Sequence, residues 1–526
     1  MRKIMKTNFI LLKFQLIAAA FSLLISCNNP EREVFDFLNL TGALLYNNTS
    51  QHTVYVQING YGGADVKVSF NNNGEELIIP RDKFEAPQPF GIRVPIGGSY
   101  EVKLTGTTPA NAMNCKIDST NTSGIISNSD ITITATCKTK WLKVAAGGYH
   151  TLAIRGDGSL WAWGQNDWNQ LGIGGDHACL LPTNTALGYI ISCQLIPKQV
   201  GTETGWTDIS AGRSFSMGVR NGNLYTWGKN TLGELGTGDV NIYKIPYPRE
   251  ALKHMSAGGN HGLVIRSDGS LFSSGLNDAW QTNSDITNQK TCGGTTTYNC
   301  ILTPTQIGAE TTWSFVSGGG IQSGWSLAMK SDKTLWAWGA GALGQMGQTV
   351  TDACNPGAAN CRKIPVQIAG TWSSVSAGGE HNLGIKTDGS MWGWGYNLYG
   401  SVGNGTVVNV FAPVDVGGGL TAWTSISAGG YHSLAIKNNG TLWSWGINNR
   451  GQLGNTETGT CSTYPCSLSP VQVGTDTDWQ SIAGGDAGSY AIKSDGTLWA
   501  WGRNDFGQIG VNDQTNRTAP AEVTFP

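Results

Sequence analysis

The stretch WTSISAGGYHSLAIKNNGTLWSWGINNRGQLG, residues 423–454, decides the fold of this chain. It holds a short apolar run that ends in glycine, at residues 426–428, and a second apolar run at residues 433–437. The Asn-Gly pair at residues 439–440 favours a two-residue hairpin turn, because both turn positions readily take positive φ. The return run, residues 442–445, puts two tryptophans on one face, since side chains alternate along a strand. The stretch therefore predicts three short antiparallel strands.

This unit recurs seven times, starting from Trp141, with copies that begin 46 to 65 residues apart. The opening tryptophan is present in six copies, and Leu252 takes its place in the third. A Pro-x-x-Val unit, as at residues 470–473, predicts a fourth strand that tolerates a sheet edge. Four strands in each of seven copies predict an all-β fold, a seven-bladed β-propeller over residues 140–526. The structural repeat tryptophan that precedes glycine is found at Trp163, Trp227, Trp338, Trp394, Trp445 and Trp501.

The repeat resembles the regulator of chromosome condensation family. The family signature AGxxHTLAL…DGxLYxWGxNxxGQLG is matched by AAGGYHTLAIRGDGSLWAWGQN, residues 145–166, and by the other copies. The resemblance covers nearly three quarters of the chain and implies a seven-bladed propeller. It leaves the function open: the nuclear founder exchanges guanine nucleotide on a small GTPase, whereas a propeller-type β-lactamase inhibitor protein only binds protein.

The two ends of the repeat region suggest how the ring closes. The last Pro-x-x-Val unit, residues 520–523, has no repeat after it, and the first copy has no such unit before it. We therefore expect the C-terminal strand to complete the first blade.

The N-terminus has the features of an export signal. Arg2 and Lys3 give it a positive start, and the apolar run at residues 16–25 is too short to span a bilayer comfortably. The run ends in Leu-Ile-Ser-Cys, residues 24–27, which resembles the lipobox of bacterial lipoproteins. In that family the signal peptidase cuts before the cysteine, whose thiol carries a diacylglycerol, so Cys27 is the expected lipid attachment site.

A different module lies between the signal and the first repeat. Its β-branched and alternating runs, at residues 53–57, 66–70, 77–79, 100–104 and 131–136, predict a small β-sandwich. The fold class is immunoglobulin-like, although the core tryptophan typical of that fold is missing. The expected organisation is a signal peptide at 1–26, a tether at 27–40, the β-sandwich at 41–139 and the propeller at 140–526.

The cysteine count supports export to an oxidising compartment. Setting Cys27 aside, ten of the 11 cysteines remain, and they fall in close sequential pairs. No pair has C-x-x-C spacing and only His177 lies close to a cysteine, so we expect no metal and no cofactor. The predicted disulfides join Cys115 to Cys137, Cys179 to Cys193, Cys292 to Cys300, Cys354 to Cys361, and Cys461 to Cys466.

Four of these pairs lie in inserts, and each insert precedes the fourth strand of its copy. Because the insertion points are equivalent, the inserts should emerge on one face of the propeller. Rigid, disulfide-closed loops bind at a lower entropic cost, but the same bonds could serve only to staple long loops. Both interpretations stay open for the inserts at residues 173–196, 282–303, 349–364 and 455–469.

No catalytic residue is predicted. One repeat position is histidine in four copies, and catalytic sites are rarely built several times over, so these residues are expected to make structural hydrogen bonds. The motif G-x-G-x-x-G at residues 339–344 is in register with W-G-x-N-x-x-G of the other copies and lacks a βαβ context. The histidines are His150, His261, His381 and His432.

The composition narrows the function further. With 34 basic and 36 acidic residues the formal charge is −2, which gives no electrostatic footprint for nucleic acid. The prediction is a monomeric, non-catalytic binding protein, anchored by lipid at the outer membrane or cell surface, with a protein or other macromolecular ligand. An enzyme acting at the insert face is the alternative. Guanine-nucleotide exchange and an envelope assembly scaffold are less favoured.

Overall fold

The computed structural model describes residues 51–524 apart from 60–64, 71–75, 81–89, 96–97, 109–112, 119–121, 127–128, 175–177, 181–189, 283–287, 294–296, 322–323, 351, 355–358, 420–421 and 457–458. Every element in this part of the chain is a β-strand, so the protein is all-β as predicted. The described residues contain no helix that is long and apolar enough to cross a membrane. The predicted signal peptide, Cys27 and the tether fall outside the described residues.

Residues 51–139 form the N-terminal module, which is built from two four-stranded sheets. The strand order is β4-β1-β8-β6 in one sheet and β3-β2-β5-β7 in the other, and β1 and β8 pair in parallel. Strands occur at all five predicted runs, and three further strands, β4, β6 and β7, had no clear signal. The bounds are β1 Gln51–Asn59, β2 Asp65–Phe70, β3 Glu76–Ile79, β4 Phe90–Pro95, β5 Ser99–Thr108, β6 Met113–Ile117, β7 Ser123–Ile125 and β8 Ile131–Thr139.

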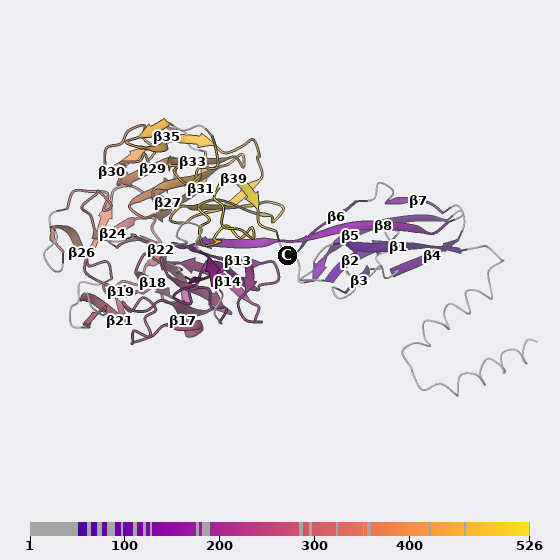
Figure 1. Ribbon diagram of the computed structural model, residues 1–526, viewed down its shortest axis with the longest axis horizontal. Helices are drawn as coiled ribbons and strands as arrows, with labels where there is room; N and C mark the ends of the chain where they lie inside the picture. Colours follow the sequence, from indigo (N-terminus) through magenta and orange to yellow (C-terminus); the bar gives the residue numbers. More distant parts are fainter. Residues whose placement is uncertain are drawn as a thin grey trace, which may run out of the picture.

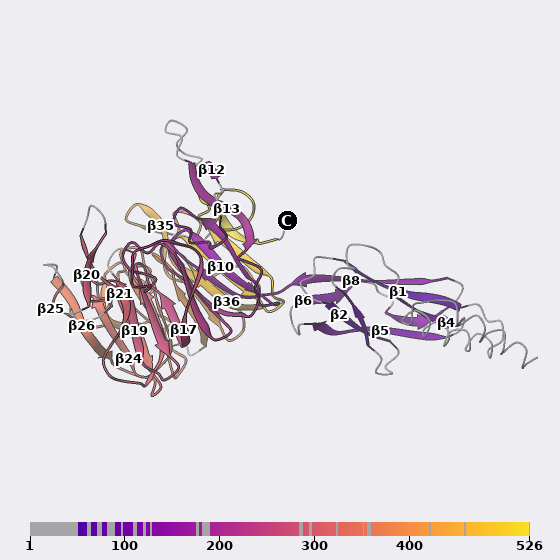
Figure 2. The ribbon, with the colours of Figure 1, turned by 90° about the horizontal axis from the view of Figure 1, so that it is seen from below.

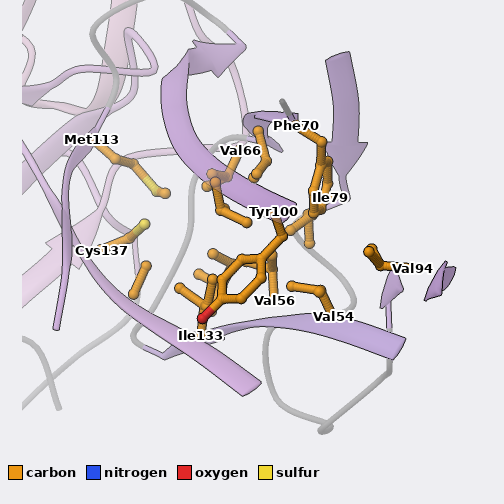
Figure 3. Packing of buried hydrophobic residues seen from close by; sticks show 14 of the residues in the cluster. Val54, Val56, Val66, Phe70, Ile79, Val94, Tyr100, Met113, Ile133 and Cys137 are labelled. Atoms are coloured by element: carbon orange, nitrogen blue, oxygen red, sulfur yellow. The ribbon is translucent and has the colours of Figure 1, made fainter. Parts of the chain in front are cut away.

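One hydrophobic core joins the two sheets of this module. Alternate residues of β2 are buried, as the period of a strand requires, and they meet Val54 and Ile133 of the other sheet (Figure 3). Cys115 and Cys137 lie directly opposite each other on β6 and β8 and form a disulfide at the edge of this core.

The repeats form seven four-stranded antiparallel units that lie around one centre (Figure 1). Units 1 and 2 contain β9 Trp141–Ala146, β10 His150–Arg155, β11 Leu160–Gln165 and β13 Ile190–Gln199, then β14 Trp206–Ala211, β15 Phe215–Arg220, β16 Asn223–Gly228 and β17 Tyr243–Ala257. Units 3 and 4 contain β17 again, β18 His261–Arg266, β19 Leu271–Leu276 and β21 Tyr298–Gln306, then β22 Trp313–Gly319, β23 Trp325–Lys330, β24 Leu335–Ala340 and β26 Ala359–Ile368. Unit 5 contains β27 Trp372–Ala377, β28 His381–Lys386, β29 Met391–Gly395 and β30 Val410–Asp415. Units 6 and 7 contain β31 Trp423–Ala428, β32 His432–Lys437, β33 Leu442–Ile447 and β35 Tyr464–Gln472, then β36 Trp479–Gly484, β37 Gly488–Lys493, β38 Leu498–Gly502 and β39 Arg517–Glu522.

Units 2 and 3 share one long strand. The first half of β17 pairs with β16, where Tyr243 lies opposite Gly228, and the second half pairs with β18, where Ala257 lies opposite Gly262. The two units therefore appear as one eight-stranded sheet.

The tryptophan of each Trp-Gly pair donates a hydrogen bond to the backbone of the preceding unit. Trp227 Nε1 donates to the Gln170 carbonyl at 2.9 Å, and Trp445 Nε1 donates to the Ser401 carbonyl at 2.9 Å. In the third unit, where serine replaces tryptophan, Ser274 Oγ reaches the equivalent carbonyl of Glu234 at 3.5 Å. The other four tryptophans of this set make the same bond: Trp163, Trp338, Trp394 and Trp501.

The expected closure by strand exchange is wrong. The C-terminal strand β39 pairs with β38 of its own unit, where Arg517 lies opposite Gly502, and the first unit takes its outer strand β13 from its own copy. The ring closes instead through the same kind of contact that joins the other neighbouring units. Trp163 donates to the Gln508 carbonyl at 2.8 Å, and its ring packs in one core with residues of unit 7. An exchanged strand is unnecessary because this interface buries large side chains of its own, including Trp141, Trp163 and Tyr490.

The inserts are β-hairpins rather than irregular loops. In each, the outer strand of the unit continues and an extra short strand pairs with it (Figure 2). Since strands alternate in direction, these hairpins emerge beside the turn between the first two strands of each unit. We call this side the insert face. The extra strands are β12 Ala178–Leu180, β20 Gln289–Cys292, β25 Asp352–Ala353 and β34 Gly459–Cys461.

The N-terminal module joins the propeller on the other side, which we call the junction face. Lys140 is the one residue between β8 and β9, and Trp141 N donates to the Gly496 carbonyl of a hairpin turn at 2.8 Å. Lys138 also forms an ion pair with Glu522 at 3.1 Å. Figure 1 shows the resulting elongated molecule, with the module and the propeller at opposite ends.

Candidate binding face

The four repeat histidines lie between units and make one repeated contact. His150 Nε2 is 2.9 Å from Ser216 Oγ of the next unit, and this hydroxyl donates to the Gln170 carbonyl at 2.7 Å. The hydroxyl has one proton and gives it to the carbonyl, so the histidine must carry its proton on Nε2 and donate. The same chain of bonds links His261 to Ser326, His381 to Ser433, and His432 to Ser489.

Burial keeps these histidines neutral. It lowers the pKa of His150 and His381 to about 3, and the pKa of His261 and His432 to about 4. The adjacent glycine is required by the ring: a Cβ at Gly147 would lie 2.5 Å from the His150 ring. The histidines are thus part of the framework, and they offer no open site.

Where the histidine is replaced, its partner changes with it. In unit 4 Trp325 begins the second strand, and its Nε1 donates to the Asn382 side chain of unit 5 at 2.8 Å. Asn382 in turn donates to the Gln345 carbonyl at 3.0 Å. The interface therefore keeps a side-chain relay to the same backbone carbonyl with different residues.

A second repeated feature, which the sequence did not reveal to us, surrounds the junction face. Each unit ends its second strand with lysine or arginine, and this cation lies against the aromatic rings of its own unit. Lys437 Nζ is 3.7 Å from the Trp443 ring centre and 4.8 Å from that of Trp423. Such contacts stabilise by about 0.5–2 kcal/mol each. The other cations are Arg155, Arg220, Arg266, Lys330, Lys386 and Lys493.

The insert face has a narrow opening at the centre of the ring. A cavity of about 110 Å³ is lined by the glycine-rich turns of all seven units. Backbone hydrogen bonds run from each turn to the next, and the last, from Asp486 N to the Gly147 carbonyl, closes the circle at 3.3 Å. Arg213, Ile321 and Asp486 stand at this opening. Burial raises the pKa of Asp486, while Arg503 and Arg213 oppose the rise.

Tyrosines gather beside this opening on units 5 and 6. The ring centres of Tyr396 and Tyr431 lie 5.7 Å apart, and Tyr399 lies within 5.9 Å of both. Tyr464, from the hairpin of unit 6, extends the group outward at 5.9 Å from Tyr399. Aromatic side chains of this kind are enriched in binding surfaces because they combine apolar area with a polar end.

A buried carboxyl lies next to these rings. Glu380 is 9% exposed, and the Tyr396 backbone N donates to its carbonyl at 3.0 Å. Burial raises the pKa of its carboxyl to about 7, and the Gln345 side chain opposes the rise with a hydrogen bond at 3.2 Å. Sequence reasoning missed this residue. The available signal was that Glu380 stands at a turn position where Tyr149 and Tyr431 stand in other copies.

Disulfides close the described hairpins on this face. Bonds join Cys292 to Cys300, Cys354 to Cys361, and Cys461 to Cys466. Cys193 is also disulfide-bonded, while the side chain of Cys179 lies outside the described residues. In the part of the chain that the structure describes, no group of three or more His, Cys, Asp or Glu side chains could hold a metal ion.

Comparison with family models decides what these repeats are. The model described as the regulator of chromosome condensation (RCC1) repeat matches residues 157–219, 221–265, 332–385, 388–436, 439–492 and 495–526. A second model of the same repeat matches residues 141–170, 252–279, 372–401, 423–452 and 479–508. The chain belongs to this family.

Relatives of the RCC1 repeat family share most of the propeller. The ultraviolet-B receptor UVR8 of Arabidopsis thaliana is 25% identical over 395 residues, which covers 72% of this chain and 81% of the receptor. The mitochondrial RCC1 domain-containing protein RUG3 of the same plant is 26% identical over 390 residues, with 70% and 82% covered.

Solved structures agree with the fold. Prp20p from Saccharomyces cerevisiae, described with its binding to Gsp1p and histones, superposes with a TM-score of 0.57 at 17% identity, covering 73% of this chain and 88% of Prp20p. Yeast RCC1 (Prp20) bound to Kap60 gives a TM-score of 0.56 at 17% identity, with 73% and 85% covered. The structural neighbours are thus RCC1-type β-propellers, and members of the family bind protein partners.

Proposed function

We propose that this protein is an exported, lipid-anchored binding protein that presents the insert face of its propeller to a protein partner. The supporting observation is the direction of the two faces. The N-terminal module joins the junction face beside Gly496, whereas the disulfide-closed hairpins and the tyrosine group lie on the insert face. A chain held at Cys27 would then expose the insert face away from the membrane.

The chemistry of the insert face fits binding rather than catalysis. The four repeat histidines are buried and committed to hydrogen bonds between units. The accessible groups include aromatic rings and hairpins restrained by disulfides, which lose little conformational entropy on binding. Yeast RCC1, which shares this fold, has been solved bound to the protein Kap60. An enzyme acting at the same face remains the second candidate.

Binding can be tested with a matched pair of surface changes. The full chain from residue 28 is immobilised through its N-terminus and exposed to envelope and extracellular protein. A partner retained by the native chain should be lost when Tyr399 and Tyr464 of the insert face are changed to serine. It should be retained when the exposed Arg93 of the N-terminal module is changed to serine. Equal retention by both variants would refute binding through the insert face.

Anchoring needs its own measurement. Radioactive palmitate should label the native chain in cells and should not label a Cys27→Ala variant. The labelled protein should sediment with membranes, because two or three acyl chains give stable anchoring. Labelling of both proteins, or of neither, would contradict a lipid anchor at Cys27.

A further inference from the structure

Glu380 occupies a turn position that recurs in every repeat, but the repeat does not require an acidic side chain there. The same turn position holds Tyr149, Ser214, Asn260 and Tyr431 in other units, so the framework accepts uncharged residues there. Burying a carboxyl costs free energy unless a partner compensates it. Within the described residues, the one hydrogen-bond partner of the Glu380 carboxyl is the neutral Gln345 amide. A costly group that the fold does not need is a candidate for a binding role.

The rings of Tyr396 and Tyr431 lie near this carboxyl, and the Tyr399 ring packs against both of them. Tyr396 and Tyr399 come from the loop of unit 5, and Tyr431 comes from the turn of unit 6. The planes of each pair are inclined by 64° to 85°, with ring centres 5.6 to 5.9 Å apart. The charge of Glu380 raises the pKa of Tyr431, which burial brings to about 12, so the carboxyl and the phenol are close enough to interact. The negative faces of aromatic rings attract cations.

Elsewhere in the molecule, the same combination of rings and carboxylate encloses a cation. Lys493 Nζ lies 4.9 Å from the Trp479 ring centre and 5.2 Å from that of Trp499, and it is 2.7 Å from Asp476. On the insert face, Lys229 Nζ lies 3.0 Å from the buried Glu234 and 5.9 Å from the Trp168 ring centre. Within the described residues, no lysine or arginine lies over Tyr396, Tyr399 or Tyr431. This group therefore has the surroundings of a cation but no cation of its own.

We propose that Glu380, Tyr396 and Tyr431 bind a hydrogen-bonding organic cation, an ammonium or guanidinium group presented by a lysine or arginine side chain of the partner. The carboxylate accepts hydrogen bonds from the cation, and the rings contact its carbon-bound surface. This deepens the proposed function by naming the chemistry that the insert face recognises, and it rests on that function for the identity of the ligand as a protein.

Small probes test the site without any partner. Ligand-observed nuclear magnetic resonance with the chain from residue 28 should detect n-butylguanidinium and n-butylammonium but not n-butylurea, the neutral analogue of the guanidinium. Tetramethylammonium should bind more weakly because it cannot donate a hydrogen bond to the carboxylate. If tetramethylammonium binds best, a lysine or arginine side chain is the wrong ligand. If butylurea binds as well as the guanidinium, the site does not recognise charge and the proposal fails.

Variants locate the site. Glu380→Gln should weaken n-butylguanidinium binding by about tenfold or more, as expected for loss of a charge-assisted hydrogen bond. Tyr431→Ala should weaken it as well, whereas Tyr431→Phe, which keeps the ring, should bind like the native chain. Glu310→Gln on the junction face is the matched control and should change nothing. Native affinity in Glu380→Gln, with its fold intact by circular dichroism, would overturn the proposal.

The pH dependence of binding separates Glu380 from its acidic neighbour. The titratable groups facing Glu380 are Tyr396 and Tyr431, and Asp486 faces Tyr431 in turn. Affinity for n-butylguanidinium should rise from pH 6 to pH 8 as the Glu380 carboxyl loses its proton. Asp486→Asn should keep this rise and Glu380→Gln should abolish it. A partner that is still captured when no probe binds would leave the proposed function standing and remove only the cation site.

Discussion

The repeat histidines make the stability of the propeller depend on acid. Each has a folded-state pKa of about 3 or 4, below its ordinary value of about 6.5, because burial disfavours the charged ring. Their stabilising contribution is therefore complete above pH 6.5 and is lost as the pH falls toward the folded-state pKa. When the pH falls from 7 to 5, the free energy of unfolding should therefore decrease by about 2 kcal/mol for each of these histidines.

The test compares His432→Gln with the native chain in denaturant melts at pH 7.5 and pH 5. The variant should lose about 2 kcal/mol less than the native chain between these pH values, because one titrating ring is gone. Arg450→Gln, an exposed change in the same unit, is the control and should lose as much as the native chain. An unchanged pH dependence in His432→Gln would contradict a buried neutral histidine.

Glu380 should act in the opposite direction. Its carboxyl has a folded-state pKa of about 7, above the ordinary value of 4.5, so the folded state holds a proton that the unfolded state releases. The stabilising effect of that proton is complete below pH 4.5 and is lost as the pH rises through 7, by about 3 kcal/mol in total. Glu380→Gln should therefore be more stable than the native chain at pH 8 and gain little at pH 4.5. Equal melting of both proteins at pH 8 would show that the carboxyl is not buried.

At the level of elements, each insert should be stabilised locally by its disulfide. The bond between Cys461 and Cys466 closes a short loop, for which the chain-entropy model gives about 2 kcal/mol. Replacing both cysteines by serine should loosen β34 and the adjoining end of β35, because β35 is the one strand of the described chain with which β34 pairs. Hydrogen exchange should accelerate there and stay unchanged in β31 to β33. Faster exchange throughout the unit would show that the hairpin supports the blade itself.

Local patterns account well for the strands. The glycine turns, the alternation of β2 and the tryptophan pairs all express rules that act over a few residues, and strands occur where these patterns predicted them. The pairing of the C-terminal strand was predicted wrongly because the repeat pattern does not show which unit receives β39. Pro520-Ala521-Glu522-Val523 has the same local sequence whether it joins β38 or the first unit.

At the level of the whole molecule, the junction should hold the N-terminal module and the propeller as one body. Lys140 alone separates β8 from β9, and Arg155 reaches back across the junction to hydrogen-bond Thr139. Small-angle scattering of the native chain should give a single narrow distribution of distances. Inserting six Gly-Ser residues after Lys140 should broaden this distribution, whereas the same insertion at Gly418 should not. A broad distribution for the native chain would contradict a rigid junction.

The amino-acid sequence by itself determined the seven copies, the strands within them and the family, because hairpin turns, strand periods and repeat signatures are local. It also located the cysteine pairs that close the inserts. Only the tertiary structure decided how the ring closes and which side chains meet on the insert face. Gln345, Glu380 and Tyr431 come from three units and are separated by dozens of residues, so no spacing rule connects them. Whether a carboxyl is buried, and whether a cation faces it, depends on the packing of neighbouring blades.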